Sequence, residues 1–340
     1  MSPARLAIAI AAADTAAALA MAQAAVGLAD LVEYRLDGMG DFHLPALIAG
    51  SPLPAIITCR SRAQGGAFSG AEGERRRILA EAIALGAAFV DVEAEALPTL
   101  AFSATTALPR PHTRLIGSQH DFAGMMGDWA SAGLRLRALG ADIVKLVGMA
   151  RTADDVLPPL AWLHGLTTPG IGLAMGAAGG PTRLLAPRFA AAFLSFAALD
   201  GPGTAPGQFT AAAMIADYGY TRLAAADPLL LLLTPDPPPW PQVAAYRAAL
   251  DAAAPPAARP WALPLPLSTL TPDLLLALQL TGAAALACLP EVERDPALRQ
   301  LGLAPAAPAY ALRPDLAALP CADPPDLARR LFTPPISRPS

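Results

Sequence analysis

The chain has very little cysteine and few charged residues. Only three of its 340 residues are cysteines (Cys59, Cys288 and Cys321), and they lie far apart. This spacing excludes a disulfide framework and a cysteine zinc site, and it favours a reducing compartment. Charged residues make up 15% of the chain and the net charge is −4. That balance argues against nucleic-acid and anionic-membrane partners, because both require a basic surface.

Long apolar runs are also missing, although the chain is 54% hydrophobic with a mean hydropathy of +0.42. This composition excludes intrinsic disorder, which requires low hydrophobicity and high net charge. A membrane-spanning helix needs about 20 predominantly apolar residues in one run. Uncharged stretches such as 15–29 and 274–290 are interrupted by Gln, Thr, Gly or Pro. We therefore expect a globular cytoplasmic protein.

Lysine is nearly absent, since 23 of the 24 basic residues are arginine and Lys145 is the one lysine. A composition rich in Ala, Pro and Arg replaces lysine with arginine wherever only positive charge matters. A desolvated lysine, unlike arginine, can lose its proton and attack a carbonyl group. Lys145 lies between Val144 and Leu146, which we take as a desolvating environment. It is the candidate nucleophile, and the alternative is that it survived by chance.

Short β-rich runs alternate with helical patterns up to about residue 218. The predicted strands are 5–10, 31–37, 55–60, 89–93, 115–120, 142–148, 171–176 and 193–199. Eight strands separated by helices over about 215 residues predict a (βα)8 TIM barrel. The alternative is a doubly wound open sheet, but no Gly-rich phosphate fingerprint follows the first strand.

Polar side chains recur at every second position of five consecutive strands. Residues two apart share a face of a strand, so these side chains are expected to point into the barrel toward its C-terminal end. Ion pairs that merely fill the core are the alternative, but desolvation usually cancels their Coulomb gain. The inward polar positions are Glu33, Arg35, Asp37, Thr58, Arg60, Asp91, Glu93, Ser118, His120 and Lys145.

Lys145 and His120 lie on neighbouring predicted strands. A nucleophilic amine beside an imidazole is the minimum set for Schiff-base chemistry with proton transfer. Two Gly-rich stretches, 64–68 and 203–208, match no nucleotide fingerprint and are interpreted as loops over the mouth of the barrel.

Seven segments occur in the order and at the spacing of one enzyme family. They are ADLVEYRLD, ITCR with the Gly-Gly that follows it, ERRRILAEAIALGAAFVDVE, IGSQHDF, GADIVKLVG, AMGAAGGPTRLL and TAPGQF. Together they make the chain, from residue 6 to 218, resemble type I 3-dehydroquinate dehydratase, the Schiff-base enzyme of the shikimate pathway. The resemblance implies a (βα)8 hydro-lyase, commonly dimeric, that uses no metal or cofactor.

The resemblance also implies roles for single residues. Lys145 would form an imine with the ketone of 3-dehydroquinate. His120 would act as general acid/base, removing a C2 proton and helping the C1 hydroxyl to leave as water. The implied substrate-binding residues are Glu33, Arg35 and Arg60 for the ring hydroxyls, Arg183 for the carboxylate, and Thr204 and Gln208 in the loop that closes over the ring.

One position departs from the family pattern in a way that bears on activity. Gln64 stands where the family has a glutamate that orients and charges the histidine. A neutral amide still accepts a hydrogen bond, but it stabilises an imidazolium less. We therefore expect dehydratase activity that is weaker than is usual in the family. Gln64, Asp91 and Glu93 are predicted to support the catalytic residues.

The composition changes after the barrel, and we place its domain at 1–222. Residues 228–320 faintly resemble the substrate-binding half of shikimate dehydrogenase, with the loop serines absent and Val292 in the lysine position. The resemblance would make this a degenerate domain, and an unrelated helical cap is the alternative. Residues 321–340 form a Pro-rich tail.

Two other functions remain open from the sequence. One is another Schiff-base lyase or aldolase on the same fold. The other is a catalytically silent barrel that binds a pathway metabolite or partner. If the chain is a dehydratase of this family, we expect a small-molecule substrate and a homodimer. We expect neither a nucleic acid nor a membrane as a partner.

Overall fold

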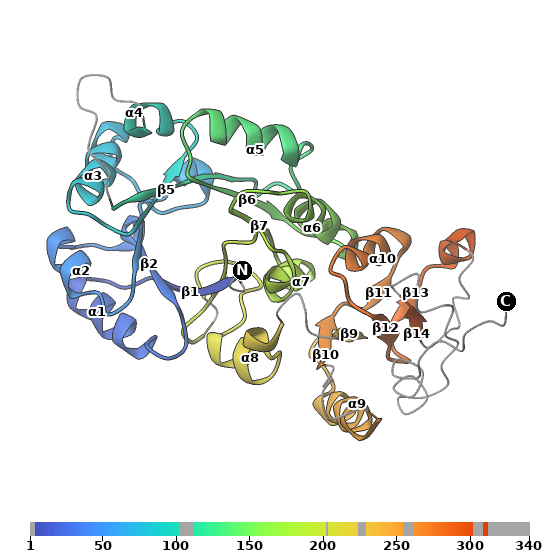
Figure 1. The fold of residues 1–340 in the computed structure, drawn as a ribbon. Coiled ribbons are helices and arrows are strands. Elements are labelled where there is room, and N and C mark those ends of the chain that lie inside the picture. Colours follow the sequence, from blue (N-terminus) through green and yellow to red (C-terminus); the bar gives the residue numbers. More distant parts are fainter. Residues whose placement is uncertain are drawn as a thin grey trace.

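The computed structural model describes residues 4–101, 112–201, 203–223, 229–253, 261–301 and 309–311 (Figure 1). Eight parallel strands form one sheet in the order β7-β6-β5-β4-β3-β2-β1-β8. The strands are β1 Arg5–Ile10, β2 Leu31–Arg35, β3 Ala55–Thr58, β4 Phe89–Glu93, β5 Arg114–His120, β6 Ile143–Met149, β7 Gly170–Met175 and β8 Leu194–Ala197. The prediction of a TIM barrel is confirmed, with strand ends shifted by at most two residues.

Helices follow the strands and cover the outside of the barrel (Figure 1). They are α1 Thr15–Ala24, α2 Leu44–Gly50, α3 Glu72–Ala84, α4 Leu97–Ala101, α5 Trp129–Ala138, α6 Leu157–His164, α7 Gly180–Leu184 and α8 Ala211–Ala216. Side-chain caps fix where three of them begin: Asp14, Asp128 and Thr210 each accept a hydrogen bond from a backbone N–H in the first turn. Such caps satisfy donors that the helix itself leaves without partners.

Strand alternation separates two cores. In β1, Leu6, Ile8 and Ile10 pack outward against helices, whereas Ala7 and Ala9 face the barrel axis. The axis is filled by apolar residues from other strands, such as Ile56, Phe89, Ile116 and Ile143. The apolar layer therefore occupies the barrel interior below the strand ends that carry the charged side chains.

The barrel closes through a short seam between β7 and β8. Gly170 at the start of β7 donates to the Ala191 carbonyl at 2.9 Å and accepts from the Phe193 N–H at 2.8 Å. On its other edge, β8 pairs with β1 over four residue pairs. The segment 191–197, which ends in β8, thus joins both edges of the sheet.

A second α/β lobe begins at β9 (Leu229–Thr234). Its sheet has the order β10-β9-β12-β14, with β10 Trp261–Pro266, β12 Ala285–Cys288 and β14 Ala309–Ala311. The helices α9 Trp240–Ala253 and α10 Pro272–Gln279 and a small β11–β13 pair (Thr269–Leu270, Glu293–Arg294) complete it. The leucines of β9 are all buried, as expected for a central parallel strand covered on both faces. The described part of the lobe is therefore α/β, not a helical cap.

The predicted tail at 321–340 and Cys321 lie outside the described residues. Cys59 and Cys288 are buried free thiols. Among the helices of the described ranges, none has both the length and the apolar composition needed to cross a bilayer.

The lobe contacts the barrel beside α6 and α7. Arg188, which follows α7 and is buried, donates to the carbonyls of Thr281 at 3.0 Å and Gly282 at 3.4 Å. Thr271, the N-cap of α10, donates to Asp154 of the barrel. The two lobes are therefore held together by polar contacts that a cation anchors.

Replacing Arg188 with alanine is expected to lower the free energy of unfolding by about 2–3 kcal/mol, because hydrogen bonds from a charged donor to buried carbonyls are lost. Chemical denaturation of the full chain measures this loss. Arg77→Ala is the control, since Arg77 is exposed on α3 and its loss is expected to stay within about 0.5 kcal/mol. Equal stability of the two variants would contradict the anchoring role.

Candidate active site

The strands deliver the predicted polar residues to the C-terminal end of the barrel. Cross-strand register places Asp91 of β4 beside Thr58 of β3, and Lys145 of β6 beside Ser118 of β5. One cavity at this end is lined by nine of the predicted site residues, with Asp91 and Glu93 buried beneath it. The nine are Glu33, Arg35, Arg60, Gln64, His120, Lys145, Arg183, Thr204 and Gln208.

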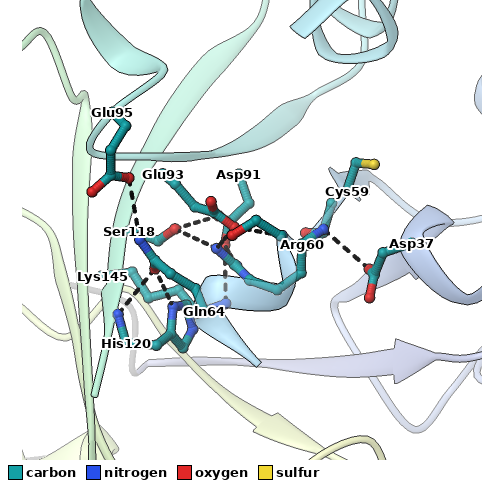
Figure 2. A network of polar contacts seen from close by, with 12 residues as sticks. Asp37, Cys59, Arg60, Gln64, Asp91, Glu93, Glu95, Ser118, His120 and Lys145 are labelled. Atoms are coloured by element: carbon teal, nitrogen blue, oxygen red, sulfur yellow. Dashed lines mark hydrogen bonds and ion pairs between the residues drawn. The ribbon is translucent and has the colours of Figure 1, made fainter. Parts of the chain in front are cut away.

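Asp91 is the centre of a buried ionic network (Figure 2). Its carboxylate accepts from the Lys145 Nζ at 3.0 Å and the Ser118 hydroxyl at 2.6 Å, and it pairs with the Arg60 Nη2 at 2.8 Å. Burial opposes ionisation of this carboxyl, but the charges of Arg60 and Lys145 hold its pKa well below the ordinary value. Asp91 is therefore ionised and fixes the position of both cations.

Glu93 ties the same network to the outer layer. Its carboxylate accepts from the Arg60 Nη1 at 3.3 Å and from the backbone N–H of Ser61 at 2.8 Å. The other oxygen pairs at 3.3 Å with Arg75 of α3, which also donates to the Cys59 carbonyl at 3.2 Å. Glu93 therefore holds the loop after β3 in place without lining the cavity.

Lys145 is surrounded by acids, and this corrects the sequence interpretation of its environment. Its Nζ lies 3.0 Å from Asp91 and 3.5 Å from Glu33, and 4.4 Å from the centroid of the Phe196 ring. Val144 and Leu146 point to the opposite side of the strand, into the outer core. The period of two that turns Lys145 inward turns its flanking residues away, so they do not desolvate the amine.

His120 lies at the end of β5, beside the lysine strand. The Gln64 Oε1 lies 3.2 Å from its Nδ1 and accepts from its backbone N–H at 3.1 Å. Burial lowers the pKa of His120 well below its ordinary value, and the positive charges of Arg60 and Lys145 lower it further. The imidazole is therefore neutral at physiological pH and can accept a proton.

Three of the four cations that line the cavity already have carboxylate partners among the described residues. Arg35 pairs with Asp37, Arg60 with Asp91 and Glu93, and Lys145 with Asp91 and Glu33.

Arg183 of α7 is the exception among these cations. It is 2% exposed, and its buried Nε has no hydrogen-bond partner among the described residues. Burial lowers the pKa of its guanidinium to about 10. A buried cation with no carboxylate beside it is costly, and no described carboxylate pairs with Arg183, so this arginine is the one arranged to receive an anion from the cavity.

The loop 203–208 covers one side of the cavity with Thr204 and Gln208. The Gln208 Oε1 accepts from the backbone N–H of Thr204 at 2.7 Å and from that of Ala205 at 3.3 Å. Gly203 has a φ of +73°, a left-handed conformation that favours glycine. The loop is therefore held by its own glutamine in the position that the structure shows.

Asp37 is the one inward prediction that the structure contradicts. β2 ends at Arg35, and Asp37 lies in a short 3₁₀ turn, Leu36–Gly38, outside the cavity lining. Its carboxylate accepts from Arg35 and from the backbone N–H groups of Arg60 and Ala67. Strand alternation stops where the strand stops, so it no longer predicts the direction of this side chain.

The sequence did not lead us to predict the apolar wall of the cavity or one acidic residue at its edge. Alternation along β6, β7 and β8 would have found most of the wall, because inward positions are inward whatever their polarity. Glu95, which accepts from the Gln64 Nε2 at 3.3 Å, follows β4 and has no sequence signal. The missed wall residues are Phe122, Val147, Leu173, Met175 and Phe196, whereas Gly65 and Ala205 line the cavity from the two loops predicted over the mouth. Among the described residues, no group of three or more His, Cys, Asp or Glu could hold a metal ion.

The geometry can be compared with known proteins. A 3-dehydroquinate dehydratase of Methanococcus maripaludis is 30% identical over 200 residues, which cover 57% of this chain and 89% of that protein. A bifunctional 3-dehydroquinate dehydratase/shikimate dehydrogenase of Arabidopsis thaliana is 35% identical over 202 residues, but these span only 33% of its length.

Solved structures extend the comparison. The 3-dehydroquinate dehydratase of Geobacillus kaustophilus matches with a TM-score of 0.55 and 25% identity, over 63% of this chain and 89% of that one. The dehydroquinate dehydratase and shikimate dehydrogenase of S. pombe matches in fold with a TM-score of 0.50 and 21% identity, over 85% of this chain and 57% of that one.

The profile of the type I 3-dehydroquinase family matches residues 6–222, the segment that contains the barrel and every residue of the cavity. The chain therefore belongs to the type I 3-dehydroquinase family.

Proposed function

We propose that the protein dehydrates 3-dehydroquinate to 3-dehydroshikimate through an imine on Lys145, with His120 as general acid/base. One observation carries this proposal: a single cavity combines a lysine amine, a neutral imidazole and a buried arginine that has no carboxylate partner in the described part of the chain. The substrate brings a ketone for the amine, an acidic C–H for the imidazole and a carboxylate for Arg183.

The chemistry begins when Lys145 gives up one proton and its free amine attacks the ketone carbon. That proton returns to the former ketone oxygen, which leaves as water, and an iminium ion remains. The iminium withdraws electrons from the adjacent C–H bond, so a weak base can remove the C2 proton. His120 takes that proton and returns one to the C1 hydroxyl, which leaves as water. Hydrolysis of the imine then releases the enone and restores the amine.

Substrate positioning follows from which groups are free. Arg183 binds the carboxylate, since a guanidinium fork matches its two oxygens. Glu33 and Arg35 line the cavity and hold ring hydroxyls, and Thr204 and Gln208 approach the ring from the loop 203–208. Arg60 is largely engaged by Asp91, Glu93 and Ser118, so its main part is to position the acids below Lys145.

The test is an assay with a covalent readout. The purified chain is mixed with 3-dehydroquinate, and the rise of the enone absorbance is followed. Borohydride added during turnover should reduce the imine and leave a stable adduct. Trypsin normally cuts after Lys145, so the adduct should appear as an uncut peptide 138–151 of increased mass. Turnover with no adduct would contradict the imine, and no turnover with no adduct would favour a silent barrel.

We also propose that residues 228–320 are a degenerate shikimate-dehydrogenase-like substrate domain. The match to the two-enzyme S. pombe chain supports this, because it covers 85% of this chain and so reaches beyond the barrel. Val292, in the lysine position, is buried and has no amine. The homodimer and the cytoplasmic location stay proposals, and light scattering of the purified chain tests the first.

A further inference from the structure

Gln64 lies between His120 and a second acid. Its Oε1 is 3.2 Å from the imidazole Nδ1, and its Nε2 donates to the Glu95 carboxylate at 3.3 Å (Figure 2). Gln64 is buried and Glu95 is exposed. The three side chains form a continuous line from the cavity to solvent.

The partners at both ends determine which way the Gln64 amide points. The backbone N–H of His120 needs an acceptor and finds the Oε1 at 3.1 Å, while the carboxylate of Glu95 needs a donor and finds the Nε2. With the Oε1 facing His120, the Nδ1 must carry the proton and donate. The lone pair is then on Nε2, which makes the imidazole a base through that nitrogen.

The backbone conformation of Gly65 helps to place the Gln64 side chain beside His120. Gly65 has a φ of +76°, and a Cβ on it would lie 2.1 Å from the Phe122 ring. That ring stacks on the His120 ring with centroids 6.4 Å apart. The turn that presents Gln64 therefore requires glycine at 65. This turn packs against Phe122, the ring that stacks on His120.

We propose that Glu95 is a positioning residue that acts on His120 through the Gln64 amide, in a carboxylate–amide–imidazole relay. The proposal rests on the dehydration proposed above. A neutral amide alone gives the imidazolium no countercharge, and Glu95 supplies that negative charge one residue further out. Glu95 also holds the amide in the orientation that protonates Nδ1.

Other charges around His120 set the size of the effect. Arg60, Lys145 and Arg35 disfavour the imidazolium, and Asp91 favours it. Glu95, like Asp91, favours the charged imidazolium. Because Glu95 is exposed, solvent and salt partly screen its charge. Its contribution is therefore moderate and is expected to shrink as salt is added.

Glu95→Gln tests the relay directly. The pKa of His120 is read by NMR, which is practical because the chain has only four histidines and His120→Gln assigns the signal. We expect this pKa to fall, because the imidazolium loses its countercharge. The acidic limb of kcat/KM should then move to lower pH, and kcat at neutral pH should fall by about two- to fivefold. Glu81→Gln, at an exposed acid of α3, is the charge-matched control and should change neither.

The second test moves the carboxylate to position 64. In Gln64→Glu alone, two carboxylates would lie close together and share a proton, so the direct contact with His120 gains little. In the double variant Gln64→Glu and Glu95→Gln, that repulsion is removed, and the pKa of His120 should rise to or above the parent value. A double-mutant cycle measures the coupling between the two positions.

The outcomes separate the relay from the reaction. An unchanged pKa of His120 in Glu95→Gln, or additive effects in the cycle, would overturn the relay even if the parent dehydrates 3-dehydroquinate. An inactive parent whose His120 pKa still falls in Glu95→Gln would support the relay and contradict the dehydration.

Discussion

Replacing Lys145 with arginine is expected to abolish the proposed dehydration while leaving the barrel folded. The guanidinium keeps the positive charge that Asp91 and Glu33 require, but it is not a nucleophile and forms no imine. Loss of a covalent nucleophile lowers kcat by on the order of 10⁴-fold or more. The enone assay measures this loss, and circular dichroism with thermal melting confirms the fold.

A matched control separates chemistry from the mere presence of an amine. The double variant Lys145→Arg and Arg77→Lys again has one lysine, now exposed on α3. It should show neither turnover nor a borohydride adduct. Residual turnover of Lys145→Arg within tenfold of the parent would show that the amine is not the reacting group.

Asp91→Asn is expected to produce the largest loss of stability. Asp91 is 2% exposed and contacts Lys145, Arg60 and Ser118, so its neutralisation leaves buried cations undercompensated. Removing one partner of such a network costs about 3–5 kcal/mol. Urea denaturation at pH 7 measures it. Glu81→Gln, at an exposed acid of α3, is the control and should cost about 0.5 kcal/mol or less.

The pH dependence gives this prediction a sign. The folded-state pKa of Asp91 is depressed, so its stabilisation is fully present above the unfolded value, about pH 4, and is lost as the pH falls below it. The difference in unfolding free energy between the parent and Asp91→Asn should therefore be constant near neutrality and shrink below about pH 4. A difference that grows on acidification would show that the carboxyl is protonated in the folded state.

The fold was predictable because the barrel repeats one local rule eight times. Strand alternation gives the direction of Glu33, Asp91, His120 and Lys145 with no knowledge of tertiary contacts. The same rule fails at Asp37, where the chain has left the strand for a turn.

The interaction partners of the side chains were harder to predict than the directions in which the side chains point. Within the described ranges Arg183 has no carboxylate partner, whereas Arg35 and Arg60 have theirs. This difference depends on which loops meet above the strands, so it is a property of the tertiary structure. Glu95 contacts Gln64 although the two residues are 31 positions apart in the sequence. The lobe contact of Arg188 spans 93 residues, beyond any local pattern.

The closing strand β8 has a consequence for how the chain folds. β1 cannot complete its pairing until Leu194–Ala197 is available, roughly 190 residues later in the sequence. Such long-range pairing carries a loop-closure entropy that must be met before the contacts form, so closure is slow. Until then β1 is paired only with β2, and its other side is an open apolar edge that can pair with other chains. Ring closure at β8 is therefore the folding step at which aggregation competes most strongly with the native barrel.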